Sequence, residues 1–440
     1  MPTPRTLTLA GVTLAAALTA ASGASAQTEV QWWHAMAGDL GQKLEKIATD
    51  FNASQKDYKI VPVYKGSYPE TMTGAIAAFR AKQNPAIVQV FEVGTATMIS
   101  AKGAIYPVHE LLKDERIAFD PKNYVGAVTG YYSDTSGNLL SMPFNSSTPV
   151  LYYNKELFQK AGLDPNKPPK TWSELVDAAK KLRASGAACG FTSSWPSWVM
   201  VENLSALHNV PIGTEQNGLG GLGTQLTISN EAVARHWTNL AEWQKDRTFD
   251  YGGRLDKAGP KFLSGECGMQ MASSGSRGGI FATAKFPVGM GMLPVYDDVK
   301  GAPQNSIIGG ATLWVLRGRP QAEYKGVAQF FEYLSKTDVQ AWWHQNTGYV
   351  PITTAAYEAS KASGFYDKNP GANIAYEQLN LNSPTPNSKG LRFGNFAQIR
   401  DVIEEELENV LSGKKTAKQG LDDAQRRANE MLRQFERANS

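Results

Sequence analysis

Cysteine and histidine are scarce in this sequence, and neither occurs in a pattern that is typical of a catalytic or metal-binding site. The 440 residues contain 2 cysteines and 5 histidines, and the histidines are dispersed along the chain. The patterns C-x-x-C, H-x-x-x-H, G-x-S-x-G and the P-loop are all missing. We therefore expect no metal site and no cofactor, and the usual sequence signs of an enzyme are absent.

An excess of one charge sign is missing too. Lys and Arg number 44 against 41 Asp and Glu, so the formal net charge is +3. Residues 1–26 contain one Arg and no acid, so the remainder has 43 basic and 41 acidic residues, a net charge of +2. Nucleic acids and anionic membrane surfaces attract strongly basic patches, so we expect neither as a partner.

The long apolar run of the chain lies at its N-terminus. Arg5 precedes an Ala- and Leu-rich run from Leu9 to Ala21, and Ala24-Ser25-Ala26 has the small residues of a cleavage site. The run is too short to span a bilayer as a helix. We predict a signal peptide over residues 1–26 and an exported, periplasmic protein of two or three domains that starts at Gln27.

Export has a consequence for the two cysteines. In an oxidising compartment, Cys189 and Cys267 form either a disulfide or two separately buried thiols, and the sequence leaves both readings open.

Strand and helix patterns alternate after the signal sequence. Strands are predicted at 29–33, 58–64 and 86–91, with amphipathic helices between them. This order predicts an α/β fold with a mainly parallel sheet covered on both faces. Ligands bind such sheets at the carboxyl ends of the strands, where Glu92 and, in a turn, Tyr68 lie. Alternatively, Glu92 is an acid at a helix start.

Two segments have the character of crossings between lobes. Residues 143–155 combine flanking prolines, small polar residues that include Ser147, and a β-rich run at 150–153. Residues 307–315 read as the return strand. Gly310 there either lets a ligand approach the backbone closely or forms a bulge or hinge.

Two features favour an anion. Ser273 follows a predicted strand and precedes a helix, where hydroxyls and free N–H groups bind phosphate oxygens, although an ordinary N-cap explains it too. Arg400 lies in a predicted helix over 397–407. Its spacing favours a surface pair with Glu404, and the alternative is a bidentate contact to a phosphate.

Aromatic residues and a glycine run complete the candidates. Trp195 and Trp198 lie in a proline-broken loop, and they either form aromatic walls or anchor the loop to the core. Tyr349, in a turn, points into a cleft or into the core. Residues 218–223 formally match a dinucleotide fingerprint, but no strand precedes them and 224–228 predicts a strand instead of a helix, so we interpret them as a loop.

Several unlinked motifs occur along the chain: Gln31–Met36, Glu92–Met98, Phe144–Lys155, Ile307–Ala311 and Gly390–Asn395. Together, and in this order, they resemble the extracellular solute-binding proteins that feed ABC importers, and within them the members that bind glycerol phosphate. The resemblance covers residues 29–437 and implies a periplasmic-binding-protein fold, with two α/β lobes, a multi-crossing hinge and a ligand cleft between the lobes. It assigns residues 27–147 and 308–350 to the N-terminal lobe and residues 148–307 and 351–440 to the C-terminal lobe.

The resemblance also implies a function. It indicates a monomeric receptor, without catalytic activity, that captures sn-glycerol 3-phosphate and glycerophosphodiesters such as glycerophosphocholine. The closed receptor would dock on ABC permease subunits served by a cytoplasmic ATPase. The implied ligand-binding residues are Tyr68 and Glu92 for the glycerol hydroxyls, Ser147, Ser273, Gly310, Tyr349 and Arg400 for the phosphate, and Trp195 and Trp198 as an aromatic wall.

Two other functions compete with this one. A sugar-binding protein of the same fold would depend on the stacked indoles of Trp195 and Trp198 more than on Arg400. A secreted phosphodiesterase or glycosidase would use Glu92 together with a second acid.

Overall fold

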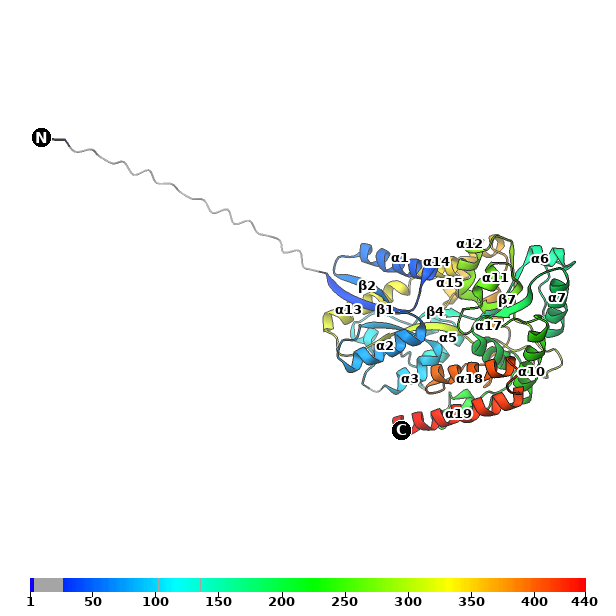
Figure 1. Ribbon diagram of the computed structural model, residues 1–440. Helices are drawn as coiled ribbons and strands as arrows, with labels where there is room; N and C mark the ends of the chain where they lie inside the picture. Colours follow the sequence, from blue (N-terminus) through cyan, green and yellow to red (C-terminus); the bar gives the residue numbers. More distant parts are fainter. Residues whose placement is uncertain (4–26, 102, 135) are drawn as a thin grey trace.

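The computed structural model describes residues 1–3, 27–101, 103–134 and 136–440, and the signal sequence predicted over 1–26 lies outside these residues apart from its first three (Figure 1). Two β-sheets form the centres of two lobes. The first has the strand order β2-β1-β3-β9-β4 and the second the order β6-β7-β5-β8. The strands are β1 (Thr28–His34), β2 (Tyr58–Tyr64), β3 (Ile87–Phe91), β4 (Met142–Ser147), β5 (Pro149–Asn154), β6 (Cys189–Ser193), β7 (Cys267–Ser273), β8 (Val288–Gly291) and β9 (Gly309–Val315).

Helices pack on both sheets, as the alternating pattern predicts. The α-helices are α1 (Gly38–Ser54), α2 (Tyr68–Arg80), α3 (Thr95–Ser100), α4 (Val108–Asp114), α5 (Gly126–Tyr132), α6 (Lys155–Lys160), α7 (Trp172–Ala184), α8 (Leu204–Leu207), α9 (Thr214–Asn217), α10 (Glu231–Lys245), α11 (Gly259–Leu263), α12 (Arg277–Thr283), α13 (Gln321–Leu334), α14 (Thr337–Thr347), α15 (Thr354–Ala362), α16 (Phe365–Lys368), α17 (Ile374–Leu379), α18 (Phe396–Leu411) and α19 (Ala417–Asn439). Short 3-10 turns are η1 (Glu92–Gly94), η2 (Pro121–Asn123) and η4 (Ser274–Ser276), and η3 (Trp198–Asn203) is a π-helix.

Each sheet contains one strand that runs against the others. β9 is antiparallel to β3 and β4, and β5 is antiparallel to β7 and β8, whereas the β1–β2, β1–β3 and β6–β7 pairs are parallel. Both exceptional strands begin just after the chain has passed from one sheet to the other. Only Thr148 separates β4 from β5. The prediction of mainly parallel strands is confirmed, and its exceptions are the crossing strands.

The predicted strand at 224–228 is wrong. These residues form only an isolated bridge, between Gly213 and Leu226. Side-chain amides of helix α19 take the place of a strand partner: Leu226 N donates to Asn429 Oδ1 at 2.7 Å and Ser229 N to Gln425 Oε1 at 2.9 Å. The apolar pattern arises because Leu226 and Ile228 are buried in the core.

The two cysteines form a disulfide. Cys189 and Cys267 are partners in the β6–β7 ladder, at the first residue of each strand, and their Cα atoms are 4.5 Å apart. The sequence left this pairing open, because the register of two strands 78 residues apart cannot be read from their composition.

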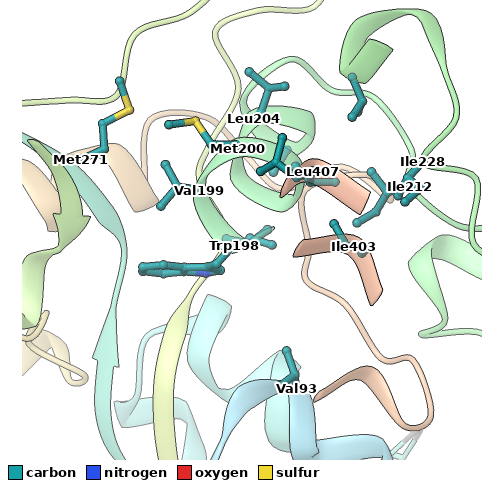
Figure 2. Packing of buried hydrophobic residues seen from close by; sticks show 14 of the residues in the cluster. Val93, Trp198, Val199, Met200, Leu204, Ile212, Ile228, Met271, Ile403 and Leu407 are labelled. Atoms are coloured by element: carbon teal, nitrogen blue, oxygen red, sulfur yellow. The ribbon is translucent and has the colours of Figure 1, made fainter. Parts of the chain in front are cut away.

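A continuous apolar core joins the second sheet to the end of the first. Figure 2 shows Trp198, Val199 and Met200 of η3 and Leu204 of α8 beside Ile403 and Leu407 of α18, with Val93 of η1 below them. Helix α18 also packs on α10 and α19. Among the described residues, none of the helices combines the length and the apolarity that crossing a bilayer requires.

Candidate functional site

A cleft of about 400 Å³ lies where the two sheets meet, and its walls contain every ligand-binding residue predicted from the sequence. The strand ends of both sheets and helix α18 contribute to it. The predicted residues that line the cleft are Tyr68, Glu92, Ser147, Trp195, Trp198, Ser273, Gly310, Tyr349 and Arg400.

Tyr68 belongs to the first turn of helix α2 and not to a preceding turn, as the sequence had suggested. Glu70 Oε2 accepts hydrogen bonds from Ser67 N at 2.6 Å and Ser67 Oγ at 2.8 Å, so the helix begins before Pro69. The S-x-x-E pattern at 67–70 was the sequence signal for this capping box. The cap fixes the Tyr68 ring, which stacks on Phe91 at 5.5 Å.

Ser147 and Gly310 meet at the two crossings. Ser147 ends β4 and is paired with Gly309, the first residue of β9. Gly310 has φ +95°, and a Cβ there would lie 2.0 Å from the carbonyl oxygen of Asn145. The β4–β9 register shifts between Pro143 and Asn145. The bulge of this ladder therefore lies in β4 at Phe144, whereas Gly310 pairs in register with Ser146. Gly310 is the point of close backbone approach that the sequence offered as the other alternative, and it lines the cleft.

Ser273 and Tyr349 lie on neighbouring parts of the cleft wall, since a Cβ on Gly275 would lie 2.6 Å from the Tyr349 ring. Ser273 ends β7, and its Oγ accepts a hydrogen bond from Gly275 N at 3.1 Å, so the N-cap reading is correct and coexists with a position on the cleft wall. Tyr349 follows α14 and stacks on Trp343 at 5.8 Å. Its side chain is buried and still faces the cleft, so both alternatives for this tyrosine hold together.

Arg400 does not form the predicted surface pair with Glu404. It is 8% exposed, because the face of α18 that carries it packs into the molecule. Arg400 Nε and Nη2 each donate to Glu202 at 2.7 Å, and Nη2 donates to Glu92 Oε1 at 2.6 Å. The i,i+4 rule applies to an exposed helix face, and no local pattern indicates that Glu202, on η3, supplies the partner.

Comparison of the sequence with known proteins identifies its family. The family model described as bacterial extracellular solute-binding protein matches residues 46–373. The sn-glycerol-3-phosphate-binding periplasmic protein UgpB of Yersinia pseudotuberculosis is 51% identical over 429 residues, which are 97% of this chain and 98% of the relative. The chain belongs to the bacterial extracellular solute-binding proteins.

Solved structures show the two-lobe fold of this solute-binding protein. UgpB of Mycobacterium tuberculosis in complex with glycerophosphocholine has a TM-score of 0.77 at 20% identity and covers 93% of this chain and 99% of its own. The maltose/maltodextrin-binding domain MalE of Bdellovibrio bacteriovorus, bound to maltotriose, has a TM-score of 0.74 at 17% identity and covers 92% and 100%. The periplasmic-binding-protein fold expected from the sequence is confirmed.

The two tryptophans of this solute-binding protein differ in position. Trp198 is not in a loop: it begins the π-helix η3, is 4% exposed, and lies so close to Gly309 that a Cβ there would be 2.3 Å from its ring. Trp195 is only partly buried and has φ +52°, and its backbone N–H donates to the backbone oxygen of Leu255 at 2.5 Å. Leu255 and Asp256, which the sequence analysis missed, thereby join the cleft wall.

Burial and ion pairing shift the protonation equilibria of the polar residues. Burial raises the pKa of Glu92 despite the opposing effect of Arg400. Burial alone would lower the pKa of Arg400, but the carboxylates of Glu202 and Glu92 raise it above its ordinary value, so the guanidinium is always charged. Burial also raises the pKa of Tyr68 and of Tyr349, which are therefore neutral hydroxyl groups that donate and accept hydrogen bonds.

Proposed function

We propose that this solute-binding protein captures sn-glycerol 3-phosphate and its diesters, such as glycerophosphocholine, for an ABC importer. The observation that carries the proposal is that nine residues, chosen from the sequence for a glycerol phosphate ligand, line one cleft. They come from strand ends and helices as far apart as Tyr68 and Arg400. The 51% identity to a protein named for sn-glycerol 3-phosphate supports the same ligand class.

The chemistry of the walls suits both halves of such a ligand. Glu92 and Tyr68 lie together at the end of the first sheet and would hold glycerol hydroxyls. Ser147, Ser273 and Tyr349 offer hydroxyl groups to the phosphate, and Gly310 allows the ligand to approach the backbone. These groups are short or rigid, so they donate hydrogen bonds without filling the cleft.

Arg400 supplies the positive charge for the phosphate. Its Nε and Nη2 are occupied by carboxylates, whereas Nη1 forms no hydrogen bond with the described part of the chain. A phosphate oxygen would take this free donor in a charge-assisted bond. Removal of water when the lobes close over the ligand would strengthen that bond.

The remaining parts of the proposal concern export and delivery. We propose that residues 1–26 direct export, that residues 27–147 and 308–350 make one lobe and residues 148–307 and 351–440 the other, and that the protein acts as a monomer. The liganded form docks on membrane permease subunits, where a cytoplasmic ATPase drives release. The protein itself performs no chemistry.

A calorimetric titration tests the ligand class. The mature protein is unfolded, stripped of ligand, refolded, and titrated with sn-glycerol 3-phosphate, glycerophosphocholine and maltose, while the ligands are monitored for turnover. We expect saturable binding of the two phosphates without product. Binding of maltose alone would establish the sugar-binding alternative, and release of products would establish the hydrolase.

A further inference from the structure

Glu202 is a buried carboxylate that neither the sequence motifs nor the proposed ligand contacts include. It is 1% exposed, on the π-helix η3, and it holds Arg400 through both carboxylate oxygens at 2.7 Å. Ser197 Oγ donates a further hydrogen bond to Glu202 Oε1 at 3.1 Å. Two oxygens on two guanidinium nitrogens fix the plane of the Arg400 group, so Glu202 determines which nitrogen faces the cleft.

The pairing also changes the charge that a ligand meets. Glu92, Glu202 and Arg400 form a triad with a formal charge of −1. Among the described residues that line the cleft, Arg400 is the single Lys or Arg side chain, whereas Glu70, Glu92 and Asp256 are acidic. The carboxylates repel each negative charge on a ligand and offset part of the attraction of Arg400, because the charges interact through a low-dielectric interior.

We propose that Glu202 is a specificity-determining residue that orients Arg400 and opposes its positive charge, so that the Glu202 carboxylate weakens the binding of a doubly charged phosphomonoester more than that of a singly charged phosphodiester. The inference rests on the proposed function, since it names the ligand charge that the same site accepts. Phosphomonoesters carry close to two negative charges at pH 8, and diesters carry one.

The variant Glu202→Gln removes the charge with little change of shape. The glutamine oxygen accepts from one guanidinium nitrogen of Arg400, its NH2 group cannot accept from the other, and Arg400 retains Glu92 as its ionic partner. The triad changes from −1 to 0, so no buried charge is left unpaired. If the Glu202→Gln protein fails to fold, Glu202→Met removes the same charge with a side chain of similar length. A third variant, Glu202→Asp, keeps the charge and shortens the side chain.

The experiment measures Kd at pH 8 for sn-glycerol 3-phosphate and for glycerophosphoglycerol, a diester with an uncharged head group. We expect Glu202→Gln and Glu202→Met to shift the Kd ratio by about tenfold in favour of the monoester, since one charge interaction of about 1.4 kcal/mol suffices for this factor. Glu202→Asp should weaken both ligands equally and leave the ratio unchanged.

A matched control comes from the same region. Glu406 is also a buried glutamate, but it pairs with Lys415 at 2.6 Å and Arg427 at 2.9 Å and does not line the cleft. Glu406→Gln should leave the Kd ratio unchanged.

An unchanged ratio in the Glu202→Gln and Glu202→Met variants, or an equal loss for both ligands, would overturn the role of Glu202 while the proposed function stands. Failure of the unmodified protein to bind either phosphate would overturn both.

Discussion

Arg400 and Glu92 are 308 positions apart in the chain, yet Arg400 Nη2 donates a 2.6 Å hydrogen bond to Glu92 Oε1. Glu92 directly follows β3 of the first lobe. Arg400 lies on α18, which packs on helices α10 and α19 of the second lobe. This contact between the two lobes therefore uses the same guanidinium that we assign to the phosphate. We expect ligand binding and lobe closure to be coupled through this side chain.

The first prediction concerns Arg400 itself. Arg400→Lys keeps a positive charge but loses the planar fork, so the Kd for sn-glycerol 3-phosphate should rise at least tenfold. Arg400→Ala should abolish measurable binding. It should also lower the free energy of unfolding by roughly 3–5 kcal/mol, because it leaves Glu92 and Glu202 buried without a cation.

Calorimetry for binding and urea unfolding for stability separate the two effects of Arg400→Ala. Maltose is titrated in parallel as a ligand without a phosphate group. An unaltered affinity for sn-glycerol 3-phosphate in the folded Arg400→Ala protein would contradict the phosphate role.

The second prediction concerns the close approach of Gly310 to the β4 backbone. Gly310→Ala places a Cβ 2.0 Å from the backbone oxygen of Asn145 at φ +95°. We expect a loss of roughly 2–5 kcal/mol in the free energy of unfolding from the combined strain and overpacking. Gly318→Ala is the matched control, since φ is +90° there and no atom lies within 4 Å of the added Cβ. Equal losses in the two variants would show that the close approach to Asn145 is unimportant.

The sequence predicted the fold more completely than it predicted the site. The strand pattern, the crossings and the lining residues could be recognised because they depend on local periodicity, turn chemistry and motif order. The ion pairs could not. Arg400 and Glu404 have the spacing of a surface pair, and only the packing of α18 shows that Arg400 faces inward to Glu92 and Glu202.

Two other differences have the same cause. The run at 224–228 has the composition of a strand, but the side-chain amide of Asn429 accepts a hydrogen bond from Leu226 N within it, and that of Gln425 accepts one from Ser229 N just after it. Trp195 and Leu255 both have positive φ, which is unusual outside glycine and cannot be read from residue type. In each case a tertiary contact decides the local structure.

The third prediction concerns the disulfide between Cys189 and Cys267. The bridge closes a segment with a sequence separation of 78. Replacement of both cysteines by alanine should lower the free energy of unfolding by roughly 4 kcal/mol through the entropy of the unfolded chain. The affinity for ligand should not change, because the cysteines begin β6 and β7 whereas Ser273 of the cleft ends β7.

Unfolding with and without a reductant gives the measurement for the disulfide, and the double-alanine protein is the control, since a reductant should not destabilise it further. An unmodified protein whose unfolding transition is insensitive to reductant would contradict the stabilising role.

The last prediction concerns Glu404, which Arg400 leaves without a cationic partner. Glu404 is 5% exposed, and the one hydrogen bond that it accepts from the described residues is a 3.5 Å contact from Ser197 N. Burial raises its pKa to about 7 from the ordinary value of 4.5. A carboxyl group whose pKa is raised by folding favours the folded state below the unfolded pKa, and this contribution is lost as pH rises through the folded pKa.

Glu404→Gln should therefore match the unmodified protein in stability near pH 4.5 and exceed it at pH 8 by up to about 3 kcal/mol, since one pKa unit corresponds to about 1.4 kcal/mol. Urea unfolding at the two pH values measures the difference, and Glu405→Gln, at an exposed neighbour paired with Arg427, should show none. If the stability of the Glu404→Gln protein relative to the unmodified protein does not rise between pH 4.5 and pH 8, this carboxyl is ionised without penalty in the folded protein.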